Sequence, residues 1–201
     1  METDDFSNTD CDHLVEFLNT VNINDTNLVK NFIQQGINAN NNLISKLFVD
    51  ASKKGYTELV KIFLDAGIDV NKGFSQNAIS EASSKGYTEI VRMLLEAKVD
   101  LNLNLSWARF AISDASSCGY IEIVKMLLEA GVDVNGENSQ NALVHASRSG
   151  HTEIVKMLLQ AGVNVHNKNS QWAIVEANRS DRKEIVEMLL QAGGNIIEAN
   201  S

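Results

Sequence analysis

Histidine is the residue type in this chain best suited to proton transfer or metal binding, because imidazole titrates near neutral pH. The chain has four, namely His13, His145, His151 and His166. A general base or a metal site needs a carboxylate, thiol or second imidazole at a matching spacing, and none of the four has such a partner at a recurring position. The sequence also lacks a nucleophile elbow, a phosphate-binding glycine loop and a metal motif. We therefore expect no catalytic residue, no cofactor and no metal.

Cysteine and aspartate lead to the same expectation. Cys118 has no activating base near it in the sequence, so we interpret it as an unreactive surface thiol. One acidic or amide position recurs along the chain and comprises Asp69, Asp100 and Asp133 with Asn38, Asn164 and Asn195. Such a column is typical of turns in which a side-chain oxygen accepts a hydrogen bond from a nearby backbone amide. We prefer this interpretation to a calcium site.

Length and charge exclude several classes of function. A chain of 201 residues with 44% hydrophobic and 21% charged residues suits one ordinary folded domain. No apolar run approaches the roughly 20 residues that a membrane-spanning helix needs. The formal net charge of -9 argues against nucleic-acid binding and predicts a basic surface on the partner. The only cysteines, Cys11 and Cys118, form no disulfide framework, so we expect a cytoplasmic protein.

A glycine position recurs along the chain in steps of 31, 31, 33, 31 and 31 residues. It comprises Gly36, Gly67, Lys98, Gly131, Gly162 and Gly193. Four apolar residues at i, i+1, i+4 and i+5 precede each copy, as in Ile154, Val155, Leu158 and Leu159. This spacing places the four on one stripe of a helix of about ten residues. The glycine indicates a positive φ at the helix end, so we expect backbone strain at Lys98.

Another helix is predicted before each of these, where alanine recurs as Ala51, Ala82, Ala115, Ala146 and Ala177. The residue between the two helices is glycine in most copies, Asn24 in the first and Asp181 in the last. Asparagine and aspartate are the other residue types that most readily enter the left-handed region. The predicted unit is a helix, a tight turn, a second helix and a polar loop. Such a unit buries too few apolar side chains to fold alone, so neighbours must stack.

Three segments, GHTEIVKMLLQAGVNV, GYTEIVRMLLEAKVDL and GYTELVKIFLDAGIDVN, resemble the second half of the ankyrin repeat. The resemblance runs from about residue 10 to residue 198. It implies an all-α solenoid of about six stacked antiparallel helix pairs, with short projecting β-turn or hairpin loops and a concave surface that holds protein partners. The domain boundaries we predict are an acidic tail at 1–9 and one repeat domain at 10–201, with repeats at about 10–40, 41–73, 74–104, 105–137, 138–168 and 169–199.

The chain departs from the family in two respects. The Thr-Pro-Leu-His turn of the family is replaced by segments that begin at Asn77 and Asn141, so the proline and histidine that link neighbouring repeats are missing. We expect the asparagine to cap the helix instead. Most repeats also have 31 residues, against about 33 in the family, so we expect short loops.

Residues that break the repeat are the candidates for partner contact, because large aromatic residues and arginine carry much of the energy of protein interfaces. In the loops these are Phe74, Leu103, Leu105, Trp107, Arg109 and Phe110. Trp172, in the place of Asn141, is another candidate. Packing under the first helix is an equally good interpretation of Phe110, Trp107 and Trp172. We expect replacement of Trp107 and Arg109 by alanine to weaken binding and to leave stability unchanged.

A second candidate set is cationic and comprises Lys85 and Arg148, with Lys53 and Arg179 at related positions. All four lie near the ends of predicted first helices, where the helix dipole alone favours a positive charge. Partner contact and dipole stabilisation both remain open for these residues.

Together these features predict a non-catalytic scaffold that binds a protein of unknown identity through its concave face of loops and first helices. The alternative is a targeting or adaptor fragment of a larger effector or regulatory protein. We expect no nucleic-acid, membrane or small-molecule ligand. The last repeat keeps the apolar residues of an internal copy, including Val186 and Leu190, so its outer side is expected to be uncovered. That side would be free for association unless Ile196 and Ile197 fold over it.

Overall fold

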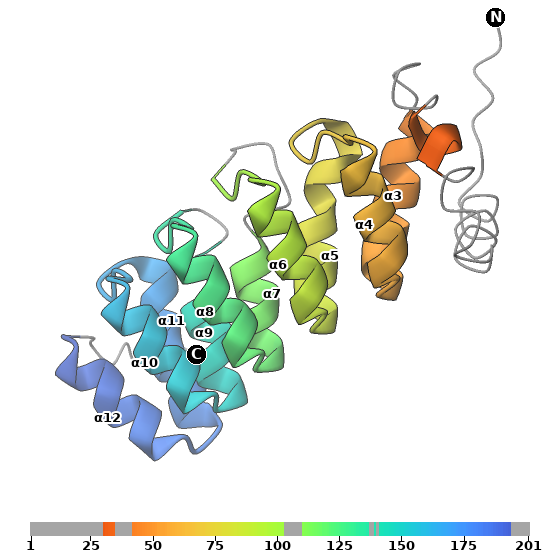
Figure 1. The fold of residues 1–201 in the computed structure, drawn as a ribbon. Helices are drawn as coiled ribbons and strands as arrows, with labels where there is room; N and C mark the ends of the chain where they lie inside the picture. Colours follow the sequence, from red (N-terminus) through yellow and green to blue (C-terminus); the bar gives the residue numbers. More distant parts are fainter. Residues whose placement is uncertain (1–29, 35–41, 103–109, 137–138, 140, 194–201) are drawn as a thin grey trace, which may run out of the picture. The chain divides into compact units, whose positions relative to one another are not determined.

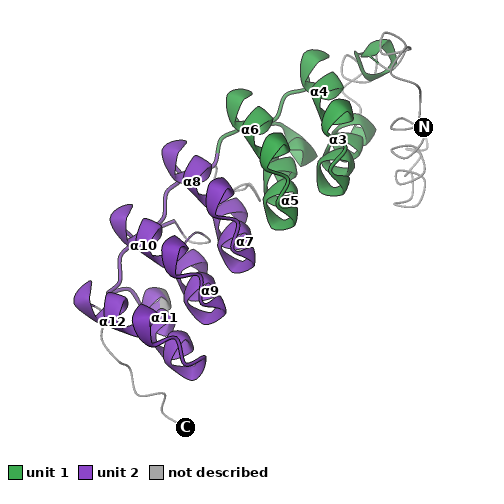
Figure 2. Ribbon diagram, turned by 60° about the horizontal axis from the view of Figure 1, so that its bottom comes forward, with its two compact units in different colours: residues 1–100 green, residues 101–201 purple. Residues whose placement is uncertain are grey.

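A computed structural model describes residues 30–34, 42–102, 110–136, 139 and 141–193. All regular secondary structure in these residues is helical (Figure 1). The chain divides into two compact units, residues 1–100 and residues 101–201 (Figure 2). The predicted all-α class, with paired helices as the repeating element, is confirmed.

Unit 1 contains two antiparallel helix pairs after a short helix at residues 30–34. Its elements are α3 (Asn42–Lys54), α4 (Thr57–Asp65), the 3₁₀ helix η2 (Gly73–Asn77), α5 (Ala78–Lys85) and α6 (Thr88–Glu96). The first helices of the two pairs, α3 and α5, pack against each other, and so do the second helices α4 and α6 (Figure 1). The two pairs are therefore stacked in the same orientation.

Unit 2 contains three helix pairs of the same kind. Its helices are α7 (Ala111–Cys118), α8 (Ile121–Glu129), α9 (Asn141–Ser149), α10 (Thr152–Gln160), α11 (Lys168–Arg179) and α12 (Lys183–Gln191). The first helices α7, α9 and α11 form one layer, and the second helices α8, α10 and α12 form the other (Figure 2). Within the unit the first helices approach one another more closely than the second helices do.

The predicted apolar stripe forms the core between the layers. In α10, Ile154, Val155 and Leu158 are buried and Leu159 is half-buried, and the quartets of α6 and α8 repeat that pattern. The alanine of each first helix, such as Ala146, is also fully buried. Because alanine has no side chain beyond Cβ, neighbouring first helices can pack closely at this position.

Left-handed backbone closes both turns of each repeat. Between the helices, Gly119 has φ 79° and Asp181, which replaces glycine in the last copy, has φ 54°. After the second helix, Gly131 has φ 82° and Lys98 has φ 60°. A residue with a Cβ atom disfavours the left-handed region, so the positive φ of Lys98 is the geometric basis of the strain predicted there.

Asparagine side chains connect successive repeats through the loops. The Nδ2 group of Asn102 donates to the carbonyl of Gly131 at 3.2 Å, while its Oδ1 accepts the amide of Asp133 at 2.9 Å. Asn135 makes the same two bonds to the repeat that follows it, and in unit 1 Asn71 binds the carbonyl of Lys98 and the amide of Asp100. We call Asn71, Asn102 and Asn135 the asparagine clips. They satisfy loop backbone groups that no helix pairs.

The turn interpretation of the acidic column is confirmed. Asp69 Oδ1 accepts the amide of Asn71, and Asp133 Oδ1 accepts the amide of Asn135, both at 2.9 Å. These bonds fix the loops that present the clips Asn71 and Asn135, so the two aspartates stabilise the backbone of these loops.

The expectation that Asn77 and Asn141 cap their helices is wrong. Asn77 ends the 3₁₀ helix η2 with φ -79° and ψ -17° and makes no side-chain cap bond, and Asn141 is the first residue of α9. An N-cap residue needs non-helical backbone angles, which a chain entering through η2 does not provide. The side-chain cap lies elsewhere, because Asn167 accepts the amide of Ser170 at the start of α11 at 2.6 Å.

Candidate protein-binding surface

The outward side of α9 and α11 carries a surface of the composition that protein interfaces favour. The buried stripe of each helix faces the core, which leaves the opposite stripe facing solvent. We call this stripe the unit 2 face, and it consists of Val144, His145 and Arg148 of α9 with Trp172, Val175, Glu176 and Arg179 of α11. Interfaces are enriched in tryptophan and arginine and depleted in lysine. This surface contains two arginines and one tryptophan, and one lysine, Lys168, lies beside it in the first turn of α11, four residues before Trp172.

Trp172 is the largest side chain on the unit 2 face, and 43% of its surface is exposed. Its place in the first helix is taken by Lys46, Asn77, Phe110 and Asn141 in the other described repeats. The neighbours Ala173 and Ile174 are buried, so helix geometry directs the indole away from the core. Trp172 is therefore not a core residue, and its contact with a partner stays a prediction.

Two valines extend the apolar contact from Trp172 along the unit 2 face. Val144 of α9 and Val175 of α11 occupy equivalent repeat positions and are both half-buried, on helices that pack against each other. The same position is Val49 in α3, Ser80 in α5 and Ser113 in α7. An aliphatic strip next to an exposed aromatic ring provides an apolar contact surface for a side chain of a partner.

Arginines occupy the carboxyl ends of the same two helices. Arg179 pairs with Glu176 at 3.1 Å, which restricts the guanidinium while leaving it exposed. Arg148 is exposed and forms no ion pair with any residue that the structure describes. A guanidinium without a carboxylate partner keeps its donors available for an incoming group.

His145 lies between these parts of the unit 2 face. Its Nδ1 is 3.1 Å from the Ser113 hydroxyl of α7. Burial, followed by the charge of Arg148, lowers the pKa of His145 below its usual 6.5, against opposing contributions from Ser113 and Asp114. Neutral imidazole therefore predominates at physiological pH. The serine and histidine do not form a nucleophilic site, because Ser113 is buried and out of reach of a substrate.

Unit 1 carries a different surface, which combines lysines with one aromatic residue. Phe74 in η2 is 46% exposed, and the Lys46 ammonium of α3 lies 5.7 Å from the centre of its ring. Lys53 and Lys85 are exposed in the last turns of α3 and α5. We call Lys46, Asp50, Lys53, Phe74, Glu81 and Lys85 the unit 1 face.

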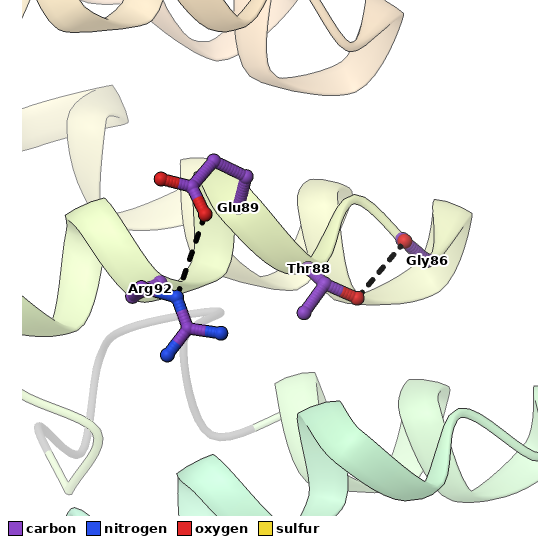
Figure 3. Close-up of polar contacts among 4 residues, drawn as sticks. All are labelled: Gly86, Thr88, Glu89 and Arg92. Atoms are coloured by element: carbon purple, nitrogen blue, oxygen red, sulfur yellow. Dashed lines mark hydrogen bonds and ion pairs between the residues drawn. The ribbon is translucent and has the colours of Figure 1, made fainter.

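The second helices present a different kind of side to solvent. Glu89 and Arg92 of α6 form a surface ion pair at 3.4 Å, and the Thr88 hydroxyl donates to the carbonyl of Gly86 (Figure 3). An exposed pair of this kind contributes about 0.5 kcal/mol to stability. Two apolar residues of unit 2 interrupt this polar side, since Ile121 of α8 is 49% exposed and Leu190 of α12 is 40% exposed.

The candidates proposed from sequence have different outcomes. Phe74, Trp172, Lys85 and Arg148 are exposed, whereas Phe110 is half-buried at the start of α7. Leu103, Leu105, Trp107 and Arg109 lie outside the described residues, so their role in binding stays a prediction. Sequence reasoning missed Val144, Val175 and His145. The sequence signal was weak, since the same position is also valine in α3 and its serine in α7 is buried.

In the described part of the chain, the histidine, cysteine, aspartate and glutamate residues form no group of three that could hold a metal ion. His151, one of the candidate bases, has a structural place, because its Nε2 lies 3.3 Å from the carbonyl of Ser117. None of the described helices is long and apolar enough to cross a membrane.

Comparison with known families identifies the architecture. A family model described as ankyrin repeats in three copies matches residues 17–105, 47–138 and 112–200, which together cover most of the chain. The chain therefore belongs to the ankyrin-repeat family, whose members are generally protein–protein interaction modules. No curated protein matches the chain.

Proposed function

We propose that this protein is a non-catalytic scaffold that binds a protein partner through the unit 2 face, with Trp172 as the central contact. The exposed indole of Trp172 is the observation that carries the proposal. An aromatic side chain of this size in water gains free energy when a partner covers it, at about 25 cal/mol per Å² of apolar area. Its arginine and valine neighbours supply the polar and aliphatic contacts of a binding hot spot.

Preorganisation is the mechanism that we propose for binding. The backbone under the unit 2 face is fixed by buried residues such as Leu143, Ala146 and Ile174. The clip from Asn135 also ties the loop that precedes α9 to the next repeat. A surface on packed helices loses little conformational freedom when a partner docks, so more of the contact energy appears as affinity.

Quantitative affinity purification with the intact chain tests this proposal. The test variant is Trp172→Ala with Arg148→Ala, and the control is Ile121→Ala, which also removes an exposed apolar side chain but from a second helix. We expect partner capture to fall by about tenfold or more for the test variant, with the melting temperature unchanged. Capture that is equal for the test variant and the control would refute the unit 2 face as the binding site.

A further inference from the structure

Charge in unit 1 is divided between its two helix layers. The first helices α3 and α5 carry four lysines and two carboxylates, whereas the second helices α4 and α6 carry two cations and four carboxylates. The net charge of -9 for the whole chain therefore conceals a cationic first-helix layer. Because local potential steers a partner at short range, this layer and not the total charge governs what binds there.

Helix dipoles do not explain this division. A cation in the last turn stabilises any helix, so the dipole would favour lysine at the ends of first and second helices alike. Lys53, Lys54 and Lys85 lie in the last turns of α3 and α5, while α4 and α6 have no basic residue there. Both second helices end in a carboxylate instead, Asp65 and Glu96. The cations follow the layer and not the helix terminus.

The same contrast holds for two of the three helix pairs in unit 2, since the first helix α7 has no basic residue in its last turn. Arg148 and Arg179 lie in the last turns of the first helices α9 and α11. The second helices α8, α10 and α12 have no basic residue in the last turn, and α8 ends in Glu129. A second, separately packed unit thus shows the same preference for cations on first helices.

Several cations of the unit 1 face are available to a ligand. Among the residues that the structure describes, Lys46, Lys53 and Lys85 form no ion pair. Lys46 instead covers the ring of Phe74, which places an ammonium group and an exposed aromatic surface side by side. The ammonium group of such a pair can contact a carboxylate of a partner, and the ring can contact an apolar side chain next to that carboxylate.

The pattern fits a polypeptide better than a nucleic acid. Phosphate backbones favour an uninterrupted cationic surface, because each neutralised phosphate releases counterions. On the unit 1 face, Asp50 lies between Lys46 and Lys53 along α3, and Glu81 lies one turn before Lys85 in α5. A peptide with spaced carboxylates can meet the lysines and leave the intervening positions to neutral or basic residues.

From these observations we infer that the unit 1 face binds an acidic segment of a partner protein, with its carboxylates on Lys53 and Lys85 and an apolar side chain on Phe74. The inference rests on the proposed function, because it assumes a scaffold that uses its first-helix layer. It reverses the basic partner surface that the total charge predicts.

A charge-reversal pair tests the inference on the full-length chain. The test variant is Lys53→Glu with Lys85→Glu on first helices, and the control is Lys61→Glu with Arg92→Glu on second helices, so that both variants have the same net charge. The probe is a fluorescein-labelled peptide of alternating glutamate and alanine, followed by fluorescence anisotropy at low and high salt. We expect the test variant to weaken binding by about tenfold or more and the control by less than about threefold.

Three outcomes would overturn the inference. The first is equal weakening by both variants, which shows that total charge sets binding. The second is the absence of peptide binding to the wild-type chain at low salt. The third is that an oligothymidylate binds with the same dependence on Lys53 and Lys85, which shows a nucleic-acid surface. Each leaves the Trp172 purification result intact, so failure of the acidic-partner inference is distinguishable from failure of the proposed function.

Discussion

Lys98 occupies a position where most repeats have glycine, with φ at 60°. The equivalent Gly67 and Gly131 have no heavy atom near the place where a Cβ would lie, so the cost at this position comes from the backbone and not from crowding. The carbonyl of Lys98 is held by the clip from Asn71 at 3.0 Å. That bond keeps the strained conformation in place.

Replacing Lys98 with glycine should relieve this strain. We expect Lys98→Gly to raise the free energy of unfolding by about 1 kcal/mol, measured by urea denaturation. Lys98→Ala is the matched control, since it removes the long side chain but keeps Cβ, and it should give little gain. Destabilisation by the glycine variant would show that contacts of the Lys98 side chain stabilise the fold by more than the backbone strain destabilises it.

His145 should make stability depend on pH. Its pKa is lowered in the folded chain by burial and by Arg148, so the unfolded chain takes up the proton first as pH falls. The stabilisation from neutral His145 is therefore present above its ordinary value of 6.5 and is lost as the pH falls from there towards the lower folded pKa. The loss is at most about 1.4 kcal/mol per pH unit for one proton.

Urea denaturation across this pH range measures the effect. His145→Gln should flatten the pH dependence. If the wild type and His145→Gln lose stability in parallel, other groups account for the pH dependence.

At the scale of the helix pair, the turn between the helices depends on a contact from the next repeat. A Cβ at Gly119 would lie 2.5 Å from the His151 ring, whereas Gly131 has open space around it. Both glycines have similar φ, 79° and 82°. The pair therefore separates the cost of backbone strain from the cost of displacing a neighbouring ring.

We expect Gly131→Ala to cost about 1 kcal/mol from strain alone, and Gly119→Ala to cost at least about 1 kcal/mol more. The additional loss arises because the His151 ring must move away from Ser117, with which it now makes a polar contact. Chemical denaturation of both variants gives the difference directly. Equal destabilisation would mean that the ring relocates without cost.

Helices were predictable at this scale, but their starting points were not. The apolar quartets and the alanine column predict both helices of a repeat because each pattern recurs in register, and Asp181 was assigned its left-handed turn correctly. The prediction that asparagine caps these helices failed because asparagine occurs instead at the end of η2 and in the first turn of α9. Only the backbone angles distinguish these positions from an N-cap position. The clips escaped notice because Asn71, Asn102 and Asn135 bind groups about 30 residues away.

For the molecule as a whole, the last repeat is less covered than the others. The valine of the second helix is fully buried in four repeats, as at Val124 and Val155, but Val186 in α12 is half-buried and Leu190 is 40% exposed. Stacked repeats rely on a neighbour to cover this side. The expectation of an uncovered end agrees with these exposures, while Ile196 and Ile197 lie outside the described residues.

Hydrogen exchange should reveal this difference. We expect the amides of α12 to exchange faster than those of residues 121–130 in α8, because local opening needs less free energy where fewer apolar contacts must break. Mass spectrometry on a dilute sample at several protein concentrations provides the measurement. Equal protection of the two helices in the monomer would show that the last repeat needs no further cover.

The partner surface was less predictable than the fold. Trp172 stood out in the sequence because an aromatic residue replaced asparagine, but Val144 and Val175 read as ordinary helix residues until their exposure was known. The total charge of the chain also led to an expectation for the partner's charge opposite to the one inferred from the unit 1 face, since it sums over two helix layers of opposite net charge in unit 1. Whole-chain composition carries no information on the layer to which a residue belongs.

The asparagine clips have a consequence for how such a gene can change. Each clip recognises only main-chain groups, so Asn71 binds Lys98 just as Asn102 binds Gly131. A duplicated repeat that carries a clip would present the same main chain to the clip of the preceding repeat, whereas the repeat at 138–168 has His166 at the clip position. Recombination among the repeats that carry clips can therefore change their number without changing the residues that make these loop bonds. Selection is then free to act on the solvent-facing positions of the first helices, where a new repeat adds a new place to recognise a partner.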